Sequence, residues 1–252
     1  MFNEHEVIAE INARGFCVFS YGAVADRFEP LRDIAARFGL GEAYVPELYA
    51  SPQLSGHIGY NIAYSDIPRD LDGVQPGSAV PGQSFHVDAL LEPLGAVKTS
   101  ILYCVRPARS GGATQVFRAC DAYEEIRATD PDAAAALADS LALRRFSTIG
   151  ETRSESTGPA FGWVDGTLST RFADGATEEW NDELGPDLER GVKLLREMSA
   201  AGGAYTHDVR LQAGECLIIR NDRVAHRGTP YVHGMLPRHL TRAMFRSAPS
   251  AS

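Results

Sequence analysis

The chain has no excess of basic residues, no long apolar run and few cysteines. Its 252 residues include 24 Lys and Arg against 33 Asp and Glu, which gives a net charge of −9. Because a phosphate backbone is bound by a basic surface, this charge disfavours nucleic-acid binding as the main function. No stretch reaches the ~18 apolar residues of a membrane helix, and the acidic start at residues 1–6 does not resemble a secretory leader. We therefore expect a cytoplasmic protein that binds neither nucleic acid nor membranes. Three of the four cysteines, Cys17, Cys104 and Cys216, lie in apolar strand-like stretches, and we expect them to be buried thiols.

The remaining composition is that of a globular protein, with 44% hydrophobic residues in a chain long enough for one large domain. Apolar spacing and caps predict helices at residues 4–14, 24–38, 121–140 (N-cap Asp121, break at Asp130-Pro131) and 186–201. We expect a helical N-terminal part (about 1–40), a lid rich in Gly, Pro, Tyr and Ser (41–84), and a β-rich core (about 83–246) with an insertion at about 121–203. This mainly β pattern with flanking helices predicts a double-stranded β-helix, the jelly roll of cupin-like proteins.

The triplet His86-Val87-Asp88 places two possible metal ligands two residues apart. If residues 84–90 form a strand, His86 and Asp88 point to the same face and can share a metal ion. A further candidate ligand, His226, follows an apolar strand at 216–219 and a polar turn at 221–223. Two imidazoles and one carboxylate are typical ligands of non-haem Fe(II) with three coordination positions left open. Taken alone, the triplet is also compatible with a surface turn capped by the aspartate.

A last strand is expected at residues 239–246, and it carries two arginines shortly after His226. Arg238, Leu240 and Arg242 share one face of this strand by alternation. Arginines among apolar residues are costly unless an anion pairs with them, so we interpret Arg238 and Arg242 as anion-binding residues. The alternative is an edge strand whose arginines are solvated.

The order of these motifs resembles the Fe(II)/2-oxoglutarate-dependent oxygenases of the taurine dioxygenase/TfdA group and their clavaminate synthase-like relatives. The resemblance covers roughly residues 83–246 and rests on His86-x-Asp88, Gly111-Gly112-x-Thr114, Leu211-x-x-Gly214-Glu215, Asn221-x-Arg223-x-x-His226 and the arginine pair. It implies that His86, Asp88 and His226 are the iron ligands. It also implies that Arg238 and Thr114 bind the distal (C5) carboxylate of 2-oxoglutarate, with Arg242 near the C1 carboxylate or an anionic part of the substrate.

The resemblance further implies an enzyme that uses Fe(II), 2-oxoglutarate and O2 to oxidise an unactivated C–H bond, most simply by hydroxylation, with release of succinate and CO2. We expect a small carboxylate-bearing substrate, an amino acid or an amino-acid-derived metabolite; a homo-oligomer is compatible with the sequence. Candidate substrate-binding residues lie in the lid, beside the metal triplet, in the insertion and on the last strand: His57, Tyr60, Asn61, Phe85, Arg153, Trp163, Arg171 and Arg242. For each of them, packing or a surface role is the alternative.

Two other classes of protein stay open. A jelly-roll Zn(II) hydrolase or isomerase can use the same two histidines and aspartate, although it does not need the arginine pair. A non-catalytic small-molecule-binding protein on the same scaffold is disfavoured because none of the expected ligand positions is missing. Consumption of 2-oxoglutarate and O2 separates an oxygenase from both.

Overall fold

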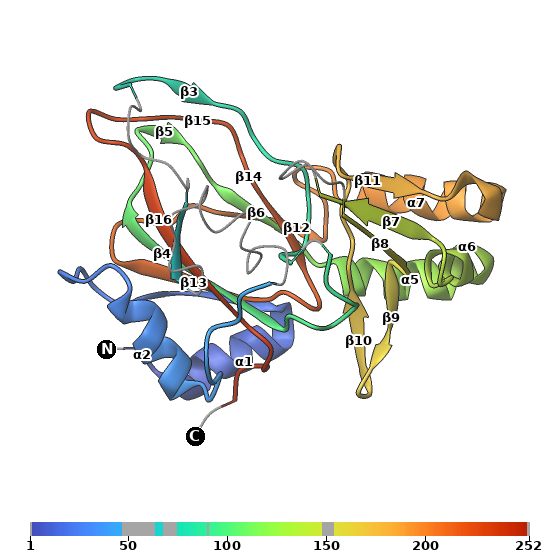
Figure 1. Ribbon diagram of the computed structural model, residues 1–252, viewed down its shortest axis with the longest axis horizontal. Helices are drawn as coiled ribbons and strands as arrows, with labels where there is room; N and C mark the ends of the chain where they lie inside the picture. Colours follow the sequence, from blue (N-terminus) through green and yellow to red (C-terminus); the bar gives the residue numbers. More distant parts are fainter. Residues whose placement is uncertain (1, 47–63, 68–74, 90, 148–153, 251–252) are drawn as a thin grey trace.

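The computed structural model describes residues 2–46, 64–67, 75–89, 91–147 and 154–250 (Figure 1). Helix α1 (Glu4–Arg14) has the expected bounds because Asn3 accepts the N–H groups of its first turn and Gly15 donates its N–H to the carbonyl of Ile11. Helix α2 (Glu29–Arg37) begins later than the expected residue 24, with Pro30 in its first turn. The two helices cover one face of the largest sheet.

That sheet has the strand order β1-β13-β4-β16-β2, with every neighbouring pair antiparallel. Its strands are β1 (Phe16–Ser20), β2 (Tyr64–Ile67), β4 (Thr99–Arg106), β13 (Glu215–Arg220) and β16 (His239–Phe245). Side chains alternate between the two faces, as strand geometry requires. Ile101, Ile218 and Phe245 pack with α1 and α2, whereas Leu102 and Leu217 belong to a core on the other face.

A second layer faces this core and consists of two three-stranded sheets, β12-β6-β14 and β3-β15-β5. Their strands are β3 (Ala79–Val80), β5 (Ser110–Gly111), β6 (Thr114–Phe117), β12 (Thr206–Val209), β14 (Ala225–Gly228) and β15 (Tyr231–Val232). Val116 and Val209 of this layer pack against Leu102 and Leu217 of the large sheet. The two layers together form the jelly roll that the sequence predicts.

Between β6 and β12 the chain forms an insertion, which lies to the right in Figure 1. The insertion contains α5 (Ala119–Thr129), α6 (Pro131–Leu137), β7 (Leu143–Phe146), β8 (Glu155–Gly158), β9 (Phe161–Val164), β10 (Thr167–Thr170), β11 (Glu178–Trp180), the 3-10 helix η1 (Asp182–Leu184) and α7 (Pro186–Met198). The expected break is confirmed, since Asp130 caps α6 by accepting the N–H of Ala133. The expected N-cap Asp121 is wrong: α5 begins at Ala119, and Asp121 pairs with Arg118.

The Asp-Gly pair at residues 165–166 is typical of a tight hairpin turn, and β9 and β10 form that hairpin. Both turn residues have positive φ, 50° and 74°, as a two-residue type I′ turn requires. All four cysteines are buried and unpaired, and burial raises the pKa of each thiol. Within the described ranges, no helix is both long enough and apolar enough to cross a membrane.

Candidate active site

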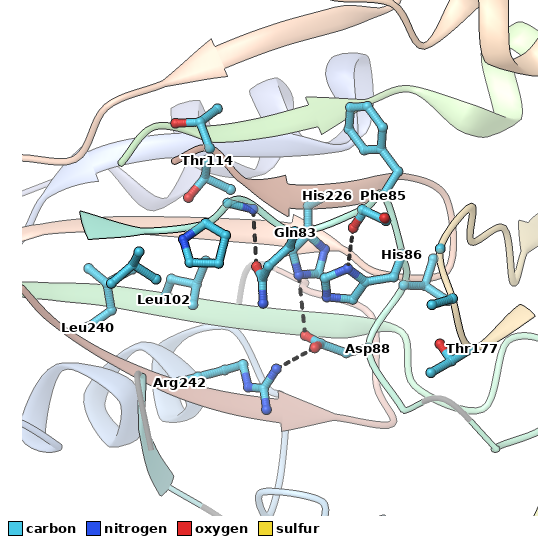
Figure 2. A pocket seen from close by; sticks show the side chains of 18 of the residues that line it. Gln83, Phe85, His86, Asp88, Leu102, Thr114, Thr177, His226, Leu240 and Arg242 are labelled. Carbon is cyan, nitrogen blue, oxygen red and sulfur yellow. Dashed lines mark hydrogen bonds and ion pairs between the residues drawn. The ribbon is translucent and has the colours of Figure 1, made fainter. Parts of the chain in front are cut away.

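A cavity of about 560 Å³ opens between the two layers and the insertion (Figure 2). Its lining comes from β4, β6, β14 and β16, from residues 80–89, and from residues of β7 and the 175–178 segment. The volume lies in the range of pockets that enclose small molecules. Seven residues named from the sequence line it: Phe85, His86, Asp88, Thr114, His226, Arg238 and Arg242.

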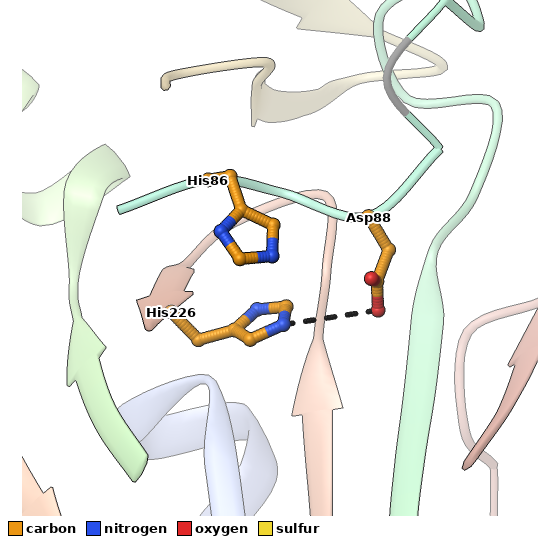
Figure 3. A group of neighbouring side chains, drawn as sticks. All are labelled: His86, Asp88 and His226. Carbon is orange, nitrogen blue, oxygen red and sulfur yellow. Dashed lines mark ion pairs between the residues drawn. The ribbon is translucent and has the colours of Figure 1, made fainter. Parts of the chain in front are cut away.

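His86, Asp88 and His226 converge at this cavity (Figure 3). One ligand atom from each side chain lies within 4.8 Å of the others, and Nε2 of His226 is 3.8 Å from Oδ2 of Asp88. Nδ1 of His86 lies 2.9 Å from the carbonyl of Ser84, which leaves Nε2 free to coordinate a metal. The donor set and spacing fit one divalent ion held on a single face, as in non-haem iron sites.

The segment that carries the first two ligands is not the strand expected at residues 84–90. His86 forms only an isolated bridge with His226, in which each N–H donates to the other carbonyl at 3.0 and 2.8 Å. Two residues on, the side-chain oxygen of Asn221 accepts the N–H of Asp88 at 2.7 Å, and its amide nitrogen donates to the carbonyl of Val97 at 3.0 Å. The polar turn before His226 therefore holds the backbone of Asp88 directly.

The charges around the three side chains keep them in the protonation states that a metal requires. Burial acts to raise the pKa of Asp88, but Arg242, the two histidines and a hydrogen bond from Ser100 outweigh it and hold the pKa well below its usual range. Burial lowers the pKa of His226 to about 4, although the charge of Asp88 opposes this shift, and burial also lowers the pKa of His86. At neutral pH the site thus presents a carboxylate and two neutral imidazoles.

The two arginines of the last strand differ in their surroundings. Nη1 of Arg242 donates to Oδ1 of Asp88 at 2.5 Å. Arg238 is 7% exposed, donates from Nη2 to the carbonyl of Gly112 at 3.1 Å, and stacks on the ring of Tyr231. Burial lowers the pKa of Arg238, and no described carboxylate lies within ion-pair distance of it. Arg238 is therefore a buried cation that has no anionic partner among the described residues.

The Gly111-Gly112 turn brings Thr114 and Arg238 to the same part of the cavity. Gly111 has φ of +68°, and a Cβ at this position would lie 2.2 Å from the carbonyl oxygen of Pro230. Only glycine permits this close approach between β5 and β15. The turn then leads into β6, where Thr114 is 5% exposed and lines the cavity.

The other substrate candidates are distributed differently. Trp163 is 62% exposed on the β9–β10 hairpin and does not line the cavity. Arg171 is buried, but its Nη2 donates to the carbonyl of Ser156 at 3.1 Å, away from the cavity lining. Phe85 lines the cavity and also packs on Phe117 in the core of the insertion. The remaining candidates lie outside the described residues: His57, Tyr60, Asn61 and Arg153.

Sequence reasoning did not single out Arg145, and it placed Asn221 in a turn and in the motif before His226 without giving its side chain a role. Arg145 is 1% exposed and lines the cavity from β7. Strand alternation within β7 places Arg145 on the same face as the buried Leu143, which is a weak sign of burial. The role of Asn221 depends on a contact across 133 residues, and no local pattern reports it.

A jelly roll whose cavity holds two histidines, one aspartate and two nearby arginines defines the class of 2-oxoglutarate-dependent iron oxygenases. Residues 3–244 match the model of the family described as taurine catabolism dioxygenase TauD, TfdA family. A uridine-5′-phosphate dioxygenase of Amycolatopsis sp is 39% identical over 255 residues, with 98% of this chain and 90% of that protein covered. Another, of Streptomyces sp, is 34% identical over 235 residues, covering 90% and 82%. The chain belongs to the TauD/TfdA dioxygenase family.

Solved structures agree on the fold. An asparagine oxygenase in complex with Fe(II), 3-hydroxyasparagine and succinate has a TM-score of 0.64 at 17% identity, with 96% of this chain and 78% of that chain covered. The PvcB protein of Pseudomonas aeruginosa has a TM-score of 0.63 at 16% identity, covering 97% and 80%. At such identities the likeness shows the jelly roll alone. Family membership identifies the enzyme as an Fe(II)- and 2-oxoglutarate-dependent dioxygenase and disfavours the zinc hydrolase and the non-catalytic binding protein.

Proposed function

We propose that this dioxygenase oxidises a C–H bond of uridine 5′-phosphate or of a closely related nucleoside monophosphate. The supporting observation is that two relatives, 39% and 34% identical and aligned over 98% and 90% of this chain, are both named uridine-5′-phosphate dioxygenases. The amino-acid substrate expected from the sequence has weaker support, because the oxygenases solved with 3-hydroxyasparagine or hydroxyarginine are 17% and 16% identical to this chain. The balanced reaction consumes one O2 and one 2-oxoglutarate for each substrate hydroxylated and releases succinate and CO2.

The proposed iron ligands are Nε2 of His86, a carboxylate oxygen of Asp88 and Nε2 of His226. Bound there, Fe(II) would supply the oxygen chemistry, coupled to decarboxylation of 2-oxoglutarate. Two sets of hydrogen bonds position these ligands. Asn221 accepts the backbone N–H of Asp88, and an isolated β-bridge links the backbones of His86 and His226. Ser100 and Arg242 orient the carboxylate of Asp88 by hydrogen bonds to its two oxygens.

Arg238 and Thr114 are proposed to bind the C5 carboxylate of 2-oxoglutarate. A planar guanidinium matches a carboxylate with two parallel hydrogen bonds, and Arg238 has no anion of its own within the described chain. Arg242, next to Asp88, would lie near the C1 carboxylate. The two arginines would thus fix both ends of the co-substrate.

The charge of the cavity suits a second anion. Its described lining contains three arginines against two carboxylates, those of Asp88 and Glu178. With a divalent iron and a 2-oxoglutarate dianion added, the formal charge of the site is still positive. This positive charge attracts a phosphate monoester more strongly than it attracts a zwitterionic amino acid, which agrees with the substrate named in the two relatives.

Substrate-dependent succinate formation tests this proposal. Purified enzyme, Fe(II), 2-oxoglutarate and air are incubated with uridine 5′-phosphate, with uridine, or with single amino acids. We expect succinate to form fastest with uridine 5′-phosphate and to stay at background in His86→Ala, while His5→Ala, an exposed histidine of α1, behaves as wild type. Amino-acid-dependent succinate with no response to uridine 5′-phosphate would contradict the proposed substrate.

A further inference from the structure

Arg145 is a buried cation in the cavity that neither the metal ligands nor the proposed co-substrate contacts explain. It projects from β7 of the insertion, whereas Arg242 lies on β16 and Arg238 directly precedes that strand; Figure 1 shows β7 and β16 in different parts of the molecule. On β7, Arg144 points outward and pairs with Glu179, while Arg145 is 1% exposed. Strand alternation thus turns one of two consecutive arginines into the cavity.

The guanidinium of Arg145 is incompletely bonded. Nη2 donates to the carbonyl of Val87 at 3.2 Å, Nη1 reaches the carbonyl of Arg171 only at 3.5 Å, and the buried Nε has no partner. A guanidinium has five N–H donors, so most of its capacity is unused. Among the described residues, no carboxylate lies within ion-pair distance of Arg145.

Glu178 is the carboxylate that faces Arg145 across the β7–β11 ladder, and it is engaged elsewhere. Its oxygens accept the N–H of Gly175 at 2.8 Å and the hydroxyl of Thr177 at 2.6 Å. Burial lowers the pKa of Arg145 to about 10 despite the opposing charge of Glu178, so the side chain is still a cation at neutral pH. A buried cation with open donors and no counter-ion is costly unless a ligand supplies the anion.

We propose that Arg145 binds the phosphate of the nucleotide substrate and thereby selects the phosphorylated nucleoside over the free nucleoside. This inference rests on the proposed function. A phosphate monoester offers oxygens that accept two parallel hydrogen bonds from a guanidinium, which a point-charge lysine does not match. Arg238 and Arg242 are occupied by 2-oxoglutarate in the same scheme, so Arg145 is the cavity arginine that remains for a second anion.

The test compares Arg145→Gln with Arg144→Gln, its exposed neighbour on the same strand. Binding of uridine 5′-phosphate and of uridine is measured by calorimetry on the enzyme loaded with Fe(II) and 2-oxoglutarate without O2. Losing two charge-assisted hydrogen bonds predicts roughly a 10²- to 10⁴-fold weaker binding of uridine 5′-phosphate by Arg145→Gln. Uridine binding, the visible charge-transfer band of the iron–2-oxoglutarate complex, and all properties of Arg144→Gln should stay as in wild type.

Unchanged binding of uridine 5′-phosphate by Arg145→Gln would overturn the proposal. So would an equal loss for uridine together with loss of the charge-transfer band, since Arg145 would then only position the metal-ligand segment through Val87. If Arg145→Gln does not fold, Arg145→Lys replaces it: a smaller loss confined to the phosphorylated ligand is expected, and equal losses for both ligands refute the role.

A wild-type enzyme that binds no uridine 5′-phosphate would defeat the proposed function separately. Inorganic phosphate then serves as the probe, with thermal unfolding of the loaded enzyme as the readout. Stabilisation of wild type and Arg144→Gln but not of Arg145→Gln supports an anion site at Arg145 for another phosphate ester. Absence of any phosphate effect on wild type overturns the anion site as well.

Discussion

Replacing Arg238 by glutamine should weaken 2-oxoglutarate binding far more than it weakens any other property of the enzyme. Arg238 is 7% exposed, and its internal partners are one carbonyl, that of Gly112, and the ring of Tyr231. Because no described carboxylate pairs with Arg238, the proposed C5 carboxylate would be its anionic partner. In the Arg238→Gln variant, the C5 carboxylate would occupy the same buried site without the guanidinium that pairs with it in wild type.

The magnitude follows from that burial. Removing one partner of a buried, hydrogen-bonded ion pair costs about 3–5 kcal/mol, and each 1.4 kcal/mol is a factor of ten in affinity. We expect the dissociation constant for 2-oxoglutarate to rise roughly 10²- to 4 × 10³-fold. Thr114→Val, which removes one neutral hydrogen bond of about 1 kcal/mol, should raise it about fivefold.

The assay is a titration of the anaerobic Fe(II) enzyme with 2-oxoglutarate, followed by the visible charge-transfer band. Turnover at saturating 2-oxoglutarate should be largely kept, because the lost contact lies at the end of the co-substrate away from the iron. Arg246→Gln is the matched control, since Arg246 follows the same strand and stacks on Tyr44. An unchanged 2-oxoglutarate affinity in Arg238→Gln would refute the assignment of Arg238.

Two further predictions concern stability. In chemical unfolding, Gly111→Ala should lower the free energy of unfolding by more than the ~1–2 kcal/mol that a non-glycine residue loses at positive φ, because its Cβ would lie 2.2 Å from the carbonyl oxygen of Pro230. The control Gly77→Ala has φ of +76° but open space around it, so it should lose only the ~1–2 kcal/mol of the unfavourable φ. Burial lowers the pKa of His226 from 6.5 to about 4, so between these pH values the unfolded chain binds a proton at His226 that the folded, metal-free protein does not. The free energy of unfolding of the metal-free protein is therefore highest above pH 6.5 and decreases as the pH falls towards 4. Between pH 7 and 5 wild type should therefore lose about 2 kcal/mol more than His226→Gln; equal losses would show that His226 does not titrate as its burial implies.

The sequence predicts the parts of this structure that depend on local pattern. Asn3 and Gly15 delimit α1, and the Asp165-Gly166 turn defines a hairpin, because caps and turns act within a few residues. The expected strand at 84–90 fails because the backbone of Asp88 is held by the side chain of Asn221, far away in the chain. His86 and Asp88 lie close together, as their spacing predicts, although an isolated β-bridge and not a strand holds this segment.

Substrate contacts are harder to infer from sequence because burial decides them. Trp163 has the residue type of a pocket lining, yet the tight turn of its hairpin carries it to the surface. Arg145 and Arg144 look alike in the sequence, and only the packing of β7 between β8 and β11 shows which one faces the cavity. The local sequence around a charged residue in a short strand does not show whether its side chain is solvated or binds a ligand.

Anaerobic reconstitution with Fe(II) and 2-oxoglutarate tests the proposed metal centre most directly. Wild type should bind one iron and develop the visible charge-transfer band of a chelated keto acid, and Asp132→Ala, at an exposed site in α6, should do the same. Asp88→Ala should lose or strongly weaken the band, since the carboxylate ligand is gone. A full band in Asp88→Ala, or an iron-loaded wild type without any band, would contradict the assignment of His86, Asp88 and His226 as the site of iron and 2-oxoglutarate.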